Sequence, residues 1–327
     1  MSIIDKPSDY FTTKLYSGTG SSHAITGVGF APNWVWIKHR NEANPHKIFD
    51  TVRGVGKSIK SNSNDAEASN EENGYVSAFG SDGFTLVGGS TSSNDVNKSS
   101  GSYVAWNWKE LAGVFDIVSY TGNGSARTVS HNLGVVPKMM IVKRRDAGGG
   151  WIVYHASLGN TKISELHENA ASQTSSASWN NTTPTTSVFT VGDANATNAN
   201  NGTFVAYLFG DTSMSKMGSY VGNGSNDGVM ITTMFKPAFV MCKRTDGTGN
   251  WGMNDTKRDP FNGTSHTCDA NNAGDADDVA IRMDILSNGF KLKTNSSNWN
   301  TSGSTYIFMA FASNPFTTST GVPATAR

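Results

Sequence analysis

The residue types that most often catalyse reactions or bind metals are spread thinly along this chain. Its seven histidines stand at no metal-ligand spacing, and the HExxH, CxxC and GxSxG motifs are absent. These histidines are His23, His39, His46, His131, His155, His167 and His266. A pair of carboxylates for glycoside hydrolysis stays open, because the two groups can come from distant strands. We therefore expect a protein that is not an enzyme and has no cofactor.

One acidic stretch is a candidate metal site. The sequence GDADD places Asp275, Asp277 and Asp278 close together, and carboxylate oxygens are the ligands that hard cations prefer. The stretch lacks the full twelve-residue pattern of a calcium loop.

Basic residues follow three apolar runs, as Lys38-His39-Arg40, Lys143-Arg144-Arg145 and Lys243-Arg244. One interpretation is a strand that reaches solvent, with the aliphatic stems lying over apolar neighbours. The other is a pocket for an acidic glycan, because arginine binds carboxylates through two parallel hydrogen bonds. Under the second interpretation Lys143, Arg144 and Arg145 are candidate glycan-binding residues.

Two tryptophans lie in tracts of Ser, Thr and Asn. Trp179 precedes Asn180, and Trp299 precedes Asn300. An exposed indole beside an amide is a typical platform for a sugar ring, which makes these four residues candidates for binding a glycan or receptor. The alternative is that each tryptophan folds back as a lid on a core, since tryptophan is highly buried on average.

The chain repeats itself, which bears on the elements that position these residues. Its tags YSGTGS, YTGNGS and YVGNGS begin at Tyr16, Tyr120 and Tyr220, at steps of 104 and 100 residues. The apolar runs PNWVWIK, PKMMIVK and PAFVMCK begin at Pro32, Pro137 and Pro237, at steps of 105 and 100. Two further landmarks recur in the same order: GFTLV, VFTVG and GFKLK, then YVAWNW, FVAYLF and YIFMAF.

Four landmarks in one order predict three copies of a module of about 100 residues. We divide the chain into a leader (1–15) and three repeats (16–112, 113–213 and 214–327). The repeated runs are short, rich in β-branched and aromatic residues, and separated by Gly, Asn, Ser and Thr, as in strands and turns. The fold class predicted is all-β, with three tandem β-sandwich modules that are jelly-roll-like.

Two patterns place strands within each module. In YVAWNW, Val104, Trp106 and Trp108 share one face of a strand, because side chains alternate with a period of two. The runs WVWI, MMIV and FVMC are apolar on both faces, as in a central strand. The tag is expected to be the tight turn of a first hairpin, with glycine at positive φ.

Composition limits the partners. The chain has 26 basic and 26 acidic residues, and charged residues make up 16% of it, so it lacks the basic footprint of a nucleic-acid-binding protein. Without an apolar run of eighteen residues, we expect no membrane insertion. Charges in the start MSIIDKPSDYF argue against a signal peptide. Two cysteines, Cys242 and Cys268, are too few for a disulfide framework and fit a reducing cytoplasm.

Several of these stretches together resemble an uncharacterised tandem-repeat β module of tailed-phage proteins, found in tail-fibre and virion structural proteins of marine and cyanobacterial phages. The resemblance lies in KPSDYFTTKLYSGTG, ITGVGFAPNWVWIKHR, FDTVRGV, SDGFTLV and SYVAWNWK of the first repeat. The second repeat is similar through YTGNG and HNLGVVPKMMIVKRR, whereas the third departs most. The resemblance implies a setting and no catalytic residues.

From that setting we expect a non-enzymatic virion structural protein, assembled in the host cytoplasm. The first hypothesis is a tail fibre or tail appendage that contacts the host surface and its glycans. The second is a capsid decoration protein, such as a head fibre or knob. The third is an envelope-glycan depolymerase. Expected partners are other virion proteins and further copies of the chain, as a homotrimer or ring.

Overall fold

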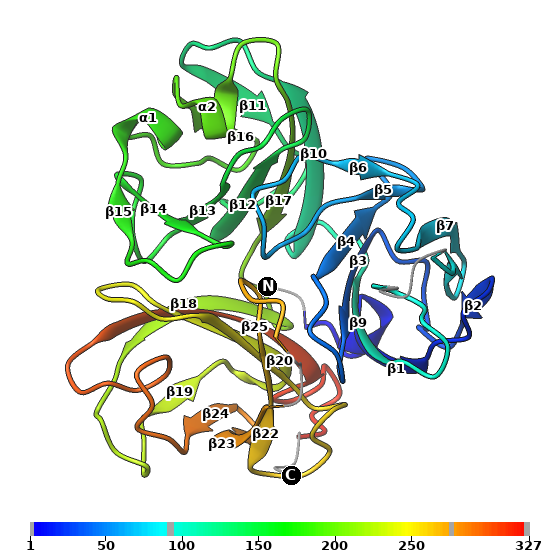
Figure 1. The fold of residues 1–327 in the computed structure, drawn as a ribbon. Coiled ribbons are helices and arrows are strands. Elements are labelled where there is room, and N and C mark those ends of the chain that lie inside the picture. Colours follow the sequence, from blue (N-terminus) through cyan, green and yellow to red (C-terminus); the bar gives the residue numbers. More distant parts are fainter. Residues whose placement is uncertain (1–2, 90–94, 275–277, 324–327) are drawn as a thin grey trace.

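The computed structural model describes residues 3–89, 95–274 and 278–323 and is drawn in Figure 1. It confirms an all-β fold, with 44% of residues in strands and 4% in helices. Each sheet takes its strands from one of three consecutive stretches of chain, which we call the N-terminal (11–108), middle (115–209) and C-terminal (215–315) segments.

The N-terminal segment has a main sheet in the order β1-β9-β3-β4, a second sheet β2-β8-β7, and the short pair β5-β6. β1 begins within the stretch predicted as a leader. The strands are β1 (Phe11–Ser17), β2 (His23–Ile25), β3 (Trp34–His39), β4 (Lys47–Asp50), β5 (Lys57–Ser58), β6 (Ala68–Ser69), β7 (Tyr75–Gly80), β8 (Gly83–Val87) and β9 (Ser102–Trp108).

The middle segment has a main sheet in the order β10-β17-β12-β13-β14-β15, with β11-β16 as a second pair. Its strands are β10 (Phe115–Thr121), β11 (Arg127–Ser130), β12 (Met139–Arg144), β13 (Trp151–His155), β14 (Lys162–Glu165), β15 (Gln173–Thr174), β16 (Val188–Val191) and β17 (Thr203–Phe209). Two four-residue helices, α1 (Ser176–Trp179) and α2 (Asn195–Asn198), lie in its loops.

The C-terminal segment forms one eight-stranded sheet, in the order β18-β25-β20-β21-β22-β23-β24-β19. Its strands are β18 (Ser215–Val221), β19 (Met230–Thr232), β20 (Phe235–Arg244), β21 (Trp251–Asp255), β22 (Thr264–Asp269), β23 (Asp278–Leu286), β24 (Gly289–Leu292) and β25 (Thr305–Pro315). This continuous, nearly barrel-like sheet differs from the two-sheet sandwich expected, so the division into three sandwich modules stays a prediction.

The central strands are covered on both faces, as their sequences predicted. In β9, Val104, Trp106 and Trp108 face one hydrophobic core, while Tyr103 and Ala105 face another. The first of these cores is shared by all three segments, whereas the second belongs to the N-terminal segment alone. The main sheets therefore turn one face toward a common centre, around which Figure 1 shows the three segments arranged.

Aromatic rings fill this common centre. Trp34 of β3 lies 4.7 Å from Tyr207 of β17, measured between ring centroids, and Phe11 of β1 lies 5.2 Å from Phe311 of β25. Phe209 and Phe311 approach to 6.1 Å. Each full burial of such a side chain stabilises the fold by roughly 1.5–3 kcal/mol, so the shared core joins the three segments into one body.

The repeated tags do not form hairpins. The strand before the second tag, β10, pairs with β17, and the strand after it, β11, pairs with β16. The second tag thus carries the chain from one sheet to another, and the third carries it between opposite edges of the eight-stranded sheet, so the hairpin predicted from sequence is wrong. Gly20, Gly124 and Gly224 do adopt positive φ, at 74°, 70° and 70°, as expected.

Before β1, the chain runs along the boundary between the N-terminal and C-terminal segments. The short 3-10 helix η1 (Pro7–Asp9) contacts both β1 and β25, and Pro7 is buried. In the described part of the chain, no helix has the length and apolar character needed to cross a membrane.

Candidate functional site

Asn300, predicted to bind a sugar, is a structural amide that fixes the third tag. Its side chain is fully buried. Its Oδ1 accepts a hydrogen bond from the backbone N–H of Asn223 at 2.9 Å, and its Nδ2 donates to the carbonyls of Ser225 at 2.8 Å and Thr294 at 2.9 Å. Because the polar atoms of this side chain are buried and bonded within the chain, they cannot bind a sugar, and the prediction for Asn300 is wrong.

A buried asparagine side chain makes the same contacts at the other two tags. We call this arrangement the amide lock. Asn198 accepts from the N–H of Asn123 at 3.0 Å and donates to the carbonyl of Ser125 at 2.7 Å. Asn97 accepts from the N–H of Thr19 at 2.9 Å and donates to the carbonyl of Ser21. Asn97, Asn198 and Asn300 are 101 and 102 residues apart, a spacing that the sequence analysis missed although it matches the repeat.

The tyrosine and first glycine of each tag complete this lock. Tyr120 Oη donates to the carbonyl of Thr197 at 2.5 Å, and its ring stacks on Phe204 with 5.1 Å between centroids. A Cβ atom on Gly122 would lie 2.3 Å from the carbonyl oxygen of Ala199, so any other residue would force the two loops apart. Each tag is therefore held against the loop that precedes the last strand of its own segment.

Trp179 and Trp299 lie in the cores. Trp179 belongs to the core of the middle segment, with its ring 5.9 Å from Tyr154, and Trp299 packs under Gly252. Their side chains are 0% and 1% exposed, so neither offers a ring to a sugar. Both tryptophans thus follow the alternative interpretation, in which the ring folds back onto a core. Asn180 differs from its neighbour, because it is exposed at the end of α1.

Asn180 lines a wide polar depression of about 570 Å³ beside the second tag. The other residues around it are Gly124, Ser125, Ala126, Ser176, Ala177 and Asp193. All of these side chains are small or polar. The depression thus has hydrogen-bonding groups but no aromatic surface on which a sugar ring could stack.

Lys143 and Lys243 are buried clamps between segments. Lys143 donates from Nζ to the carbonyl of Asn64 in the N-terminal segment at 3.1 Å, and to that of Gly149 at 2.8 Å. Lys243 donates to the carbonyls of Asn169 and Ala170 in the middle segment, at 3.4 and 2.8 Å. Burial lowers the pKa of each ammonium to about 8. Both interpretations of these lysines, a solvated strand end and a glycan pocket, are therefore wrong.

The two arginines beside Lys143 form ion pairs. Arg144 pairs with Asp146 on its own loop at 3.0 Å. Arg145 Nε lies 2.9 Å from Glu67 Oε2, which joins the middle segment to the N-terminal one. Both guanidinium groups are already bound to carboxylates, so neither forms the open acidic-glycan pocket predicted from sequence.

Three ring nitrogens link the segments in a cycle. Trp151 Nε1 donates to the carbonyl of Lys60 at 2.9 Å, across the N-terminal–middle interface. Trp251 Nε1 donates to the carbonyl of Glu165 at 2.9 Å, across the middle–C-terminal interface. His46 Nε2 lies 3.1 Å from the carbonyl of Asp269, across the C-terminal–N-terminal interface. The middle and C-terminal segments therefore each donate to a carbonyl of the preceding segment, and the N-terminal segment donates to a carbonyl of the C-terminal one.

His46 occupies the position that corresponds to Trp151 and Trp251 in the other two segments. Its hydrogen-bond partners determine which ring nitrogen carries the proton. Burial lowers the pKa of His46 well below its usual value, so the ring is neutral. The indole of Trp36 donates to Nδ1 at 2.8 Å, which leaves the proton on Nε2 to donate to Asp269. The neutral ring thus performs the same task as an indole N–H.

A second ring of polar contacts surrounds the shared core. Tyr207 Oη donates to Asp50 Oδ2 at 2.7 Å, and Trp106 Nε1 donates to Asp255 Oδ2 at 3.1 Å. At the remaining interface His155 Nε2 lies 3.3 Å from the carbonyl of Phe308, and burial lowers the pKa of His155 to about 4. Each contact again joins two different segments.

Arginines neutralise the two buried aspartates. Arg53 Nε lies 2.5 Å from Asp50 Oδ2, and Arg258 Nε lies 2.6 Å from Asp255 Oδ2. Arg258 also lies over the ring of Trp106, 5.4 Å from its centroid. A buried carboxylate without such a partner would be strongly destabilising. The sequence signal is Asp-x-x-Arg, present at 50–53 and at 255–258.

The predicted metal site lies at the edge of what the structure describes. Asp275 and Asp277 are outside the described residues, and Asp278 begins β23. Within the ranges described, no group of three or more His, Cys, Asp or Glu side chains is placed to hold a metal ion.

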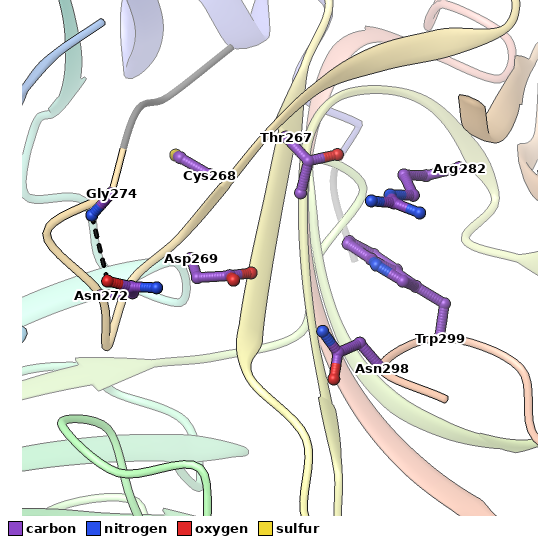
Figure 2. Close-up of a pocket in the computed structure, with 8 residues that line it drawn as sticks. All are labelled: Thr267, Cys268, Asp269, Asn272, Gly274, Arg282, Asn298 and Trp299. Carbon is purple, nitrogen blue, oxygen red and sulfur yellow. Dashed lines mark hydrogen bonds between the residues drawn. The ribbon is translucent and has the colours of Figure 1, made fainter. Parts of the chain in front are cut away.

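A cavity of about 200 Å³ lies near this stretch and is drawn in Figure 2. Its lining includes Cys268, Asp269, Arg282 and Trp299. Burial raises the pKa of the Cys268 thiol to about 11, so the thiolate needed of a nucleophile is scarce at neutral pH. Asp269 Oδ2 accepts a hydrogen bond from Asn250 Nδ2 at 2.6 Å. These groups support the local fold.

Comparison with protein families finds a match over most of the chain. Residues 6–315 match a family described as a domain of unknown function, DUF7483. The chain belongs to this family. None of the curated proteins matches it. The match spans all three segments and therefore includes every interface described above.

Proposed function

We propose that this DUF7483 protein is a non-enzymatic structural protein of a tailed-phage virion, built into a tail appendage that contacts the host surface. The observation that carries the proposal is how the chain uses its polar residues. His46, Lys143, Trp151, Lys243 and Trp251 each bind a backbone carbonyl of the neighbouring segment. Groups of this kind hold a body together rather than turn over a substrate.

We also infer that the three segments are copies of one β-sandwich module of about 100 residues. Supporting this are the amide locks at Asn97, Asn198 and Asn300 and the ring contacts at positions 46, 151 and 251, all at the repeat spacing. The C-terminal segment, with its nearly barrel-like sheet, is then the copy that has diverged most in structure. Its sequence also departs most from the shared pattern.

A closed cycle of three segments suits a virion part. In symmetric oligomers three separate subunits form such a cycle, whereas here one chain forms it alone. Further copies of the chain, in a homotrimer or ring, and other virion proteins are the partners proposed. Weak sites for host glycan on several copies would add avidity without new contacts.

The test is immunogold electron microscopy of intact phage particles, with antibody raised against the purified chain. Gold at the tail tip or fibres is the expected result. Gold over the head would favour the second candidate, a capsid decoration protein, which the compact arrangement in Figure 1 also fits. Absence of gold from every particle would overturn the virion proposal.

An envelope-glycan depolymerase, the remaining hypothesis, is separable by a different measurement. The purified chain would then release reducing ends from host envelope glycan. We expect the release to stay at the level of a heat-denatured sample.

A further inference from the structure

The middle–C-terminal interface departs from the N-terminal–middle interface in its charged residues. At the latter, Arg53 Nη1 lies 3.3 Å from Glu67 Oε2, and Arg145 Nε lies 2.9 Å from the same oxygen. These three side chains form a continuous ionic chain between the segments. The backbone beside it is joined by a hydrogen bond from the N–H of Glu67 to the carbonyl of Arg145 at 2.8 Å.

The same backbone bond occurs at the middle–C-terminal interface without the ionic chain. The N–H of Ser172 donates to the carbonyl of Thr245 at 2.8 Å, so Ser172 takes the place of Glu67 and Thr245 that of Arg145. Leu158 takes the place of Arg53, three residues after the segment's His155. Two long cations and one long anion are thus replaced by shorter side chains.

A groove of about 330 Å³ lies where these side chains are missing. Leu158 and Thr245 both line it, from the middle and C-terminal segments respectively. A volume near 300 Å³ is at the lower end of sites for small molecules. The groove therefore lies at the place where the shorter side chains replace the ionic chain.

The groove carries an apolar surface, free hydroxyls and one cation. Half-buried Tyr220 and Val221, which is 54% exposed, form part of its wall. The hydroxyls of Ser157 and Ser219 are exposed and, within the described ranges, have no hydrogen-bond partner. Lys162, also exposed, has no acidic partner among the described residues.

We propose that this groove binds a saccharide unit that bears a carboxylate. An apolar wall fits the face of a pyranose ring, the two serines can bond its hydroxyls, and Lys162 supplies a charge-assisted bond to the carboxylate. This inference rests on the proposed host contact. It places the acidic-glycan site at the middle–C-terminal interface, away from Lys143, Arg144 and Arg145.

Binding is measured by isothermal titration of the purified full chain with digalacturonic acid and with N-acetylneuraminic acid, each compared with neutral galactobiose. We expect at least one acidic sugar to bind about tenfold or more tightly than galactobiose, because only an acidic sugar can form the charge-assisted hydrogen bond with Lys162. Binding of neither acidic sugar would overturn the proposal.

Two variants locate the site. Lys162→Gln should reduce the affinity for the acidic sugar to that for galactobiose, whereas the matched change Lys57→Gln, at the corresponding position of the N-terminal segment, should leave it unchanged. The triple variant L158R/S172E/T245R rebuilds the ionic chain of the other interface and should abolish binding. Unchanged affinity in the triple variant or in Lys162→Gln would contradict the assignment. If the triple variant does not fold, the two lysine variants decide.

The two proposals can fail independently of each other. Sugar binding is measured on the isolated chain without phage, and gold labelling is measured on phage particles without sugar. A groove that binds nothing would leave the virion proposal standing. A chain absent from every particle would leave a measured sugar affinity standing.

Discussion

Asn180 and Asn300 have the same sequence context but opposite surroundings, so one substitution at each position separates a binding role from a structural one. We consider Asn→Asp, which changes no volume and replaces the amide nitrogen by an oxygen. At Asn300 the change removes the donors to the carbonyls of Ser225 and Thr294. At exposed Asn180, whose φ is 49°, aspartate is tolerated in the same left-handed conformation.

The magnitude follows from the hydrogen bonds that the substitution breaks. Asn300 loses two N–H donors in a site from which water is excluded, and each buried acceptor left unpaired costs about 1–3 kcal/mol. The hydrogen bond from the N–H of Asn223 to Oδ1 is retained. We therefore expect N300D to lower the free energy of unfolding by roughly 3 kcal/mol and N180D by less than about 0.5 kcal/mol.

The assay is urea denaturation at pH 7, followed by tryptophan fluorescence, with equal m values as the control for comparable unfolded states. An equal small loss in N300D and N180D would refute the reasoning that Asn300 locks the tag. A large loss in N180D would refute its placement at the surface.

Two further predictions concern buried groups. Burial lowers the pKa of Lys143 and Lys243 to about 8, so above pH 8 the folded chain binds fewer protons than the unfolded chain. The free energy of unfolding should then rise between pH 8 and 9, by on the order of 1–2 kcal/mol, and K143M/K243M should lose this rise in urea titrations at each pH. In the same range the thiols of Cys242 and Cys268, whose pKa burial raises to about 12 and about 11, offset part of the rise, because unfolded thiols lose their protons at about pH 8.5. Trp179→Ala should cost about 3–5 kcal/mol in the same assay, as a core substitution does. A stable W179A chain that fails only in host adsorption would restore the platform interpretation.

The strands were predictable because their signals are local. The doubly apolar run at Trp34–Ile37 can be stable only as a strand covered on both faces, and β3 lies between β9 and β4. The alternation in β9 likewise predicted which side chains share a face. Both patterns depend on residues within one strand and need no knowledge of its neighbours.

The interfaces were not predictable in this way. A lysine after an apolar run has the same sequence whether the strand ends in water or against another segment, and the carbonyls that bind Lys143 lie up to 79 residues away. The context of Asn300 favours sugar binding because loop amides are usually exposed, whereas its partner Asn223 is 77 residues distant. The repeat spacing of Asn97, Asn198 and Asn300 was the available signal, since residues kept in all three copies are those needed by the shared structure.

The central claim is that the three segments form one body through their buried interfaces, and scanning calorimetry tests it most directly. At about 0.7 kcal/mol per residue, unfolding of the whole chain should absorb roughly 230 kcal/mol, against about 75 for one segment. We predict a single transition whose van't Hoff enthalpy equals the calorimetric value. Separate transitions, or a van't Hoff enthalpy near one third of the calorimetric value, would contradict the account, because the segments would then unfold independently.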